Sequence, residues 1–146
     1  MTYIESVNLF VDGGCRGNPG PGAIGIIIKT SDNKLLHEYS EVIGHTTNNQ
    51  AEYSALVKGL ELCAGYTRKK VNCFSDCQLL INQVNAIYRI REPKLFSLFQ
   101  NVKNHERAFE EVVYQYLNRN NPNIKRADRI LNNAFEGRSI SRSYPY

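Results

Sequence analysis

The stretch VDGGCRGNPGPG, residues Val11–Gly22, decides the fold because an acidic residue closes an apolar alternation and turn-forming residues follow it. Ahead of it, Val7, Leu9 and Val11 alternate with residues of another face, which is typical of a strand. Asp12 belongs to that other face and is expected to project from the sheet surface. The glycines and prolines after it predict a turn-rich loop of about ten residues.

Outward from this stretch, the apolar pattern predicts an α/β domain. Residues 23–30 and 35–44 predict two more strands joined by short turns, and the spacing becomes helical from Asn49 to about Tyr66. A strand at 71–75, a helix at 76–85, a helix begun by Pro93, a strand at 110–117 and a helix at 124–136 follow. Strands separated by helices require crossovers. We therefore predict a five-stranded mixed sheet, three antiparallel strands and then two parallel ones, flanked by helices.

Length and composition limit the class of protein. A chain of 146 residues is expected to form one domain, which we place at 1–137, with 138–146 as a loosely docked tail. The net charge of +4 favours a polyanionic partner. We see no apolar run near 18 residues, no signal pattern and no zinc pattern among four cysteines. We expect a cytoplasmic protein with reduced thiols and no membrane partner.

Four acidic residues stand at the ends or edges of separate predicted elements: Asp12, Glu52, Asp76 and Asp128. Each alone has a structural explanation. Asp12 suits a turn, Glu52 a capping box with Asn49, Asp76 a helix N-cap, and Asp128 a surface ion pair. Glu52, however, lies on the apolar line of its helix, where burial without a cation or partner is costly.

If the fold gathers these carboxylates, they form an oxygen-rich site suited to Mg²⁺. If the strand at 71–75 neighbours the first strand, a spacing of about 4.8 Å brings Asp12 and Asp76 close together. Two such ions side by side can cleave a phosphodiester.

The motifs VDGGCRGNPGPGAIGIII, TTNNQAEYSAL, FSDCQLLINQV and ADRILNNA occur in this order between about Val7 and Glu136. Together they resemble type 1 ribonuclease H. The resemblance implies a ribonuclease H-like fold and endonucleolytic hydrolysis of the RNA strand of RNA/DNA hybrids, giving 5′-phosphate and 3′-hydroxyl ends. The short segment YRIREPK and the chain length imply a free-standing member without a basic protrusion or an added hybrid-binding domain.

The resemblance also implies roles for individual residues. Two Mg²⁺ ions, or Mn²⁺, are expected on the four carboxylates, with Glu52 also contacting a 2′-hydroxyl of the RNA. The substrate-binding positions implied are Gly13, Asn18, Thr47, Asn48 and Asn49. Many members carry a His in the loop before the last Asp. Here that loop is NRNNPN, and Arg119 is the nearest charged candidate for a catalytic role.

Other functions remain open at this point. One alternative is a non-catalytic module that binds RNA/DNA hybrids, which would be expected to lose one or more carboxylates. Another is a nuclease of the same fold that acts on DNA, although such enzymes usually hold three carboxylates and lack the GGCRGNPG loop. A third is a domain detached from a reverse transcriptase. We expect a monomeric enzyme.

Overall fold

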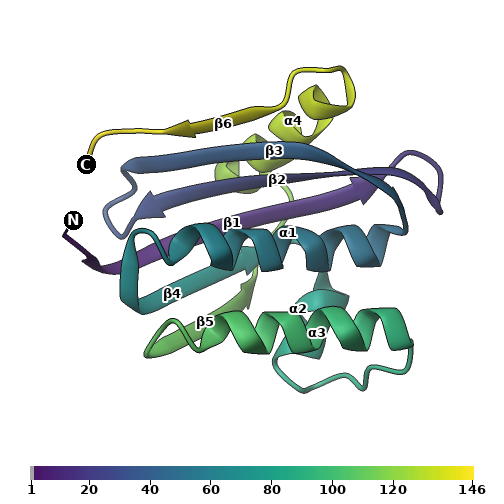
Figure 1. Cartoon of the computed structure of the whole chain (residues 1–146), viewed down its shortest axis with the longest axis horizontal. Helices are drawn as coiled ribbons and strands as arrows, with labels where there is room; N and C mark the ends of the chain where they lie inside the picture. The colour runs from purple at the N-terminus through teal and green to yellow at the C-terminus, as the bar shows by residue number, and fades with distance from the viewer. Residues whose placement is uncertain (1) are drawn as a thin grey trace.

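A computed structural model describes residues 2–146. A mixed sheet forms the centre of the molecule, with helices on both of its faces (Figure 1). In chain order the elements are β1 (Ile4–Cys15), β2 (Gly20–Thr30), β3 (Leu35–Thr46), α1 (Asn48–Cys63), β4 (Thr67–Ser75), α2 (Gln78–Val84), α3 (Pro93–Glu106), β5 (Glu111–Tyr116), α4 (Pro122–Phe135) and β6 (Ile140–Ser143). Within residues 2–146, no helix combines the length and the apolar character that crossing a membrane requires.

The strands lie in the order β5-β4-β1-β2-β3-β6. The pairs β1–β2, β2–β3 and β3–β6 are antiparallel, whereas β1–β4 and β4–β5 are parallel. The predicted α/β class and the predicted three antiparallel and two parallel strands are thus confirmed. Strand β1 lies inside the sheet, between β4 and β2.

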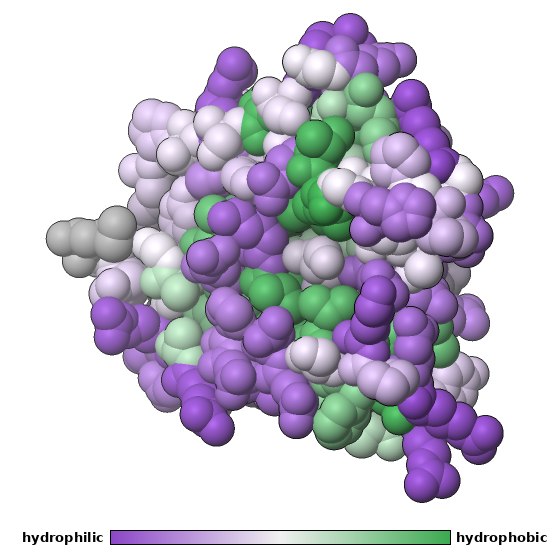
Figure 2. Space-filling model, turned by 45° about the vertical axis from the view of Figure 1, so that its right-hand side comes forward, coloured by the Kyte–Doolittle hydropathy of each residue, from purple (hydrophilic) through white to green (hydrophobic). Residues whose placement is uncertain are grey.

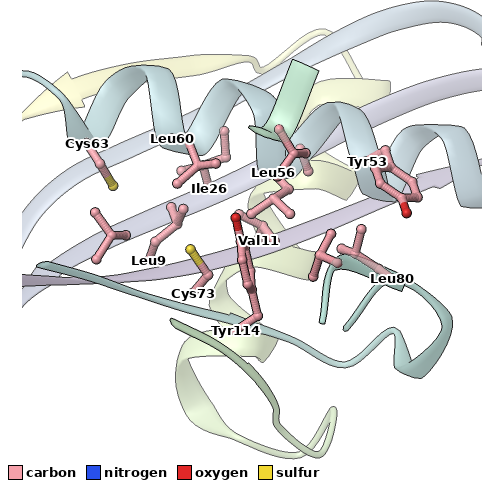
Figure 3. Packing of buried hydrophobic residues seen from close by; sticks show 14 of the residues in the cluster. Leu9, Val11, Ile26, Tyr53, Leu56, Leu60, Cys63, Cys73, Leu80 and Tyr114 are labelled. Carbon is pink, nitrogen blue, oxygen red and sulfur yellow. The ribbon is translucent and has the colours of Figure 1, made fainter. Parts of the chain in front are cut away.

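The predicted alternation along β1 decides which helix covers which face. Val7, Leu9 and Val11 are fully buried in the larger apolar cluster, which includes residues of α1 (Figure 3). Phe10 faces the other way, into a second cluster with residues of α4. Gly25 lets α4 approach the sheet, because a Cβ there would lie 2.1 Å from the carbonyl oxygen of Ala127. This close contact fixes the position of α4 over the sheet.

The loop after Asp12 is shorter than predicted. Gly13, Gly14 and Cys15 continue β1, and Cys15 pairs with Gly22 of β2, so the loop contains residues 16–19 alone. Gly13 and Gly14 therefore lie in a strand and not in a turn, and Gly13 serves packing. A Cβ on Gly13 would lie 2.2 Å from the carbonyl oxygen of Ala51 in α1. The TRKK segment, residues 67–70, likewise opens β4 and is not a turn.

The count of five strands is wrong, and so is the expectation of a loosely docked tail. Residues Ile140–Ser143 form β6 on the outer edge of β3. The Tyr144 hydroxyl donates to a Glu38 carboxylate oxygen at 2.5 Å, and Arg126 of α4 donates to the same carboxylate at 2.7 Å. A four-residue, mostly polar strand has no hydrophobic periodicity for a sequence pattern to reveal. It forms because the edge of β3 offers free backbone groups.

Candidate active site

Three of the four predicted carboxylates meet at one edge of the sheet. Oxygen atoms of Asp12, Glu52 and Asp76 all lie within 4.8 Å of one another. The register explains part of this, because Phe10 of β1 pairs with Phe74 of β4 in parallel. Asp12 and Asp76 each follow two residues later, so both leave neighbouring strands at the same edge. The predicted proximity of Asp12 and Asp76 is therefore confirmed.

Glu52 comes to this edge from the helix that crosses β1. Its side chain accepts a hydrogen bond from the backbone amide of Gly13 at 2.8 Å. The alternative explanation of Glu52, a capping box with Asn49, is wrong, because Thr47 is the N-cap of α1 and accepts from the amide of Gln50 at 3.2 Å. Glu52 thus faces the sheet, as its place on the apolar line of the helix indicated.

Asp128 lies near this group but stands somewhat apart from it. It is exposed on α4 and lines, with the other three carboxylates, a pocket of about 390 Å³. Arg119 lines the same pocket, together with Asn120 and Lys125, which the sequence analysis did not identify. Lys125 precedes Asp128 by three residues, so the two side chains lie on the same face of α4. This spacing in the sequence could have indicated Lys125 as a pocket residue.

The carboxylates disfavour one another's charge. Burial, followed by the charges of Glu52 and Asp76, raises the pKa of Asp12 well above its ordinary value. Burial and the charge of Asp76 raise the pKa of Glu52, and burial raises that of Asp76 despite the opposing effect of Arg119. A bound divalent cation would remove this repulsion. Clustered carboxylate oxygens are the donor set that Mg²⁺ and Mn²⁺ take, so the residues fit such ions.

The predicted substrate-binding residues gather beside the carboxylates at the start of α1. The Asn18 side-chain oxygen accepts from the amide of Asn48 at 3.1 Å, and the Asn48 side-chain oxygen accepts from the amide of Cys15 at 3.0 Å. These bonds tie the β1–β2 loop to the helix start. Asn48 and its neighbour Asn49 are exposed. Figure 2 turns the right-hand side of Figure 1 towards the viewer. It shows a mostly hydrophilic face with hydrophobic residues between the hydrophilic ones.

Comparisons with known proteins agree with this geometry. A family model described as reverse transcriptase-like matches residues 10–130. A bifunctional protein of Mycobacterium tuberculosis is 30% identical over 131 residues, which cover 89% of this chain and 35% of that protein. Ribonuclease H1 from Halobacterium salinarum, known from a crystal structure, has 29% sequence identity and a TM-score of 0.86. The match covers 91% of this chain and 99% of that one. The LC11 ribonuclease H1, solved in complex with an RNA/DNA hybrid, is 32% identical with a TM-score of 0.82, over 90% of this chain and 97% of that one.

The chain therefore spans about a third of the length of the mycobacterial relative but nearly all of the two solved structures. The likeness covers the strands and helices that carry the four carboxylates.

Proposed function

The chain belongs to the ribonuclease H family, with the fold of its type 1 members, and we propose that it hydrolyses the RNA strand of RNA/DNA hybrids endonucleolytically. The observation that carries this proposal is the meeting of Asp12, Glu52 and Asp76 within 4.8 Å, with Asp128 on the wall of the same pocket. Carboxylates gathered in this way can hold the divalent ions of metal-assisted phosphoryl chemistry.

Asp12, Glu52, Asp76 and Asp128 would hold two Mg²⁺ ions, with Mn²⁺ as the other candidate. When bound, such a pair activates water for in-line attack and stabilises the leaving 3′ oxygen, giving 5′-phosphate and 3′-hydroxyl ends. Asp12 would hold an ion together with either partner, since its carboxylate oxygen lies within 4.8 Å of those of Glu52 and Asp76. The Gly13 amide holds the Glu52 carboxylate in place through its 2.8 Å hydrogen bond. Arg119, whose charge acts on Asp76, is proposed to take the place of the missing His by assisting product release, because a guanidinium stays charged and does not exchange protons.

The residues at the start of α1 are proposed to position the hybrid. Exposed Asn49 and the side chains of Asn18 and Thr47 would contact its strands, with Gly13 and Asn48 beside them. The first backbone amides of a helix favour phosphate. Glu52, next to the cut, would accept from a 2′-hydroxyl and so make RNA the cleaved strand.

We also propose a cytoplasmic monomer. All four cysteines are free, which suits a reducing compartment. Sedimentation of the purified protein tests the monomeric state.

The test is cleavage of an RNA/DNA hybrid labelled on its RNA strand, in Mg²⁺, Mn²⁺ or EDTA, beside the Asp76→Asn variant. RNA cutting that requires a divalent ion and is absent from the variant supports the proposal. Cutting of a DNA-only duplex at a similar rate would instead favour a DNA nuclease of the same fold. Tight hybrid binding without cutting would favour a non-catalytic hybrid-binding module.

A further inference from the structure

Arg16 opens the four-residue loop between β1 and β2, and its side chain is held in a defined place. Its guanidinium carbon lies 4.5 Å from the ring centroid of Phe135, the last residue of α4. Its backbone amide donates to the carbonyl oxygen of Pro21 at 2.9 Å, which fixes the start of the loop. Although Arg16 is exposed, no carboxylate within residues 2–146 forms an ion pair with it.

A second hollow, of about 220 Å³, connects Arg16 with the carboxylates. Arg16 and Phe135 line it, and it shares Asp12 and Asp128 with the larger pocket. Asp128, Asn132 and Phe135 stand four and then three residues apart on α4, so they form one continuous face along this hollow. An extended ligand can therefore reach from the carboxylates to the guanidinium.

We propose that Arg16 binds a phosphate of the cleaved RNA strand next to the scissile phosphate, with Phe135 as its support. This inference rests on the proposed function. A strand whose scissile phosphate lies at the carboxylates must continue past them, and the second hollow offers a path that ends at a cation. Guanidinium groups bind phosphate through two parallel N–H donors. Stacking on Phe135 restricts the Arg16 side chain before binding, which lowers the entropy lost when the phosphate is bound.

The first test compares Arg16→Ala with Arg68→Ala. Arg68 is a matched control because its guanidinium also lies over an aromatic ring, that of Tyr3, at 4.7 Å, and it follows the first residue of β4 at the opposite end of the sheet. For Arg16→Ala we expect KM for the hybrid to rise about tenfold, with kcat changed by less than about twofold. The slope of log affinity against log salt should fall by about 1. Arg16→Lys should recover part of the loss, and Phe135→Leu should raise KM while keeping the charge.

The second test locates the phosphate. Hybrids carry one uncharged methylphosphonate at each RNA-strand position within about two nucleotides of the cut, and both wild type and Arg16→Ala are measured on each. At one position the methylphosphonate should weaken hybrid binding by wild type but leave hybrid binding by Arg16→Ala unchanged. The reason is that the methylphosphonate and the Arg16→Ala change remove the same contact.

The outcomes separate this inference from the proposed function. If wild type cuts the hybrid and Arg16→Ala behaves like Arg68→Ala, Arg16 has no part in binding and the inference is overturned. Absence of coupling at every substituted RNA-strand position, or a loss in kcat alone, would also overturn it. If wild type does not cut at all, the proposed function fails instead. Melting temperatures of the arginine variants should match wild type, because both arginines lie at the surface.

Discussion

The Gly13 amide donates to the Glu52 carboxylate at 2.8 Å, so the strand that carries one acidic residue of the site also positions another from the crossing helix. The contact is possible because Gly13 has no side chain. Helix α1 passes so close to β1 that a Cβ on Gly13 would lie 2.2 Å from the Ala51 carbonyl oxygen and 2.6 Å from the Glu52 amide.

Gly13→Ala should therefore push α1 away from the strand and displace Glu52. We expect a loss of about 1–3 kcal/mol in the free energy of unfolding, as in other overpacked sites, together with a large loss of cleavage. Gly14→Ala is the matched control, because a Cβ there meets nothing closer than the Asn48 side-chain oxygen at 3.8 Å. Urea unfolding and a cleavage assay measure both. Equal stability of the two variants would contradict this account of the glycine.

Asp12→Asn and Asp76→Asn should each lower the cleavage rate by about a thousandfold or more, since a metal contributes several kcal/mol to such a reaction. The fold should remain. Without divalent ions, the melting temperature should stay equal or rise, because one of several repelling charges is removed. Asp32→Asn, in the β2–β3 turn, is the control for activity. Cleavage at the wild-type rate by either site variant would refute the metal assignment.

The raised pKa values of Asp12 and Glu52 predict how stability depends on pH without metal. Their ordinary values are 3.8 and 4.5, and the folded values lie above them. Folding therefore favours the protonated carboxyls, and this stabilisation is complete below the ordinary values and is lost as pH rises through the folded ones. In EDTA, the free energy of unfolding should fall from about pH 4 towards neutral pH.

Mg²⁺ should reverse this trend, since it binds the charged carboxylates of the folded state. The gain in stability on adding Mg²⁺ should grow with pH in wild type and should shrink in Asp12→Asn. Denaturation curves at several pH values, with Mg²⁺ or EDTA, measure this gain. A gain that does not change with pH would argue against binding by these carboxylates.

Arg119→Ala tests the residue nearest to the position of the missing histidine. Because Arg119 lines the pocket and its charge opposes the rise in the pKa of Asp76 that burial causes, we expect kcat to fall about tenfold, the loss of about 1.4 kcal/mol of transition-state stabilisation, with little change in stability. Arg107→Ala, an exposed arginine at the end of α3, is the control. A kcat equal to that of the control would leave Arg119 without a catalytic role.

Changes in the C-terminal tail, residues 138–146, test whether the domain ends at residue 137. Tyr144→Phe removes the hydrogen bond to Glu38 and should cost about 1 kcal/mol of unfolding free energy. Truncation after Gly137 should cost more, because it also removes the pairing of β6 with β3. Tyr146→Phe, at a position 74% exposed, is the control. If the truncated protein is as stable as the full chain, residues 1–137 are the complete folding unit.

Apolar spacing was enough to predict the first nine strands and helices in order, because it reports which face of each element is buried. It placed Val7, Leu9 and Val11 on one face of β1 and Asp12 on the other. It also indicated a functional role for Glu52, since burying a carboxylate on the apolar face of a helix is costly without a partner. For Asp76, the position at the end of a strand predicted a place close to Asp12 if the two strands were neighbours. For Asp128, local pattern favoured a surface ion pair, and the resemblance to ribonuclease H supplied the expectation.

The remaining features depend on contacts between residues that lie far apart in the sequence. The β6 strand exists because the edge of β3 accepts it, although its own residues have no strand pattern. The role of Gly13 depends on how close α1 comes to β1, which no local sequence encodes. Arg16 and Phe135 are 119 positions apart, and the packing of α4 on the sheet brings them together. Local periodicity reports burial, whereas the meeting of distant residues is set by packing of the whole domain.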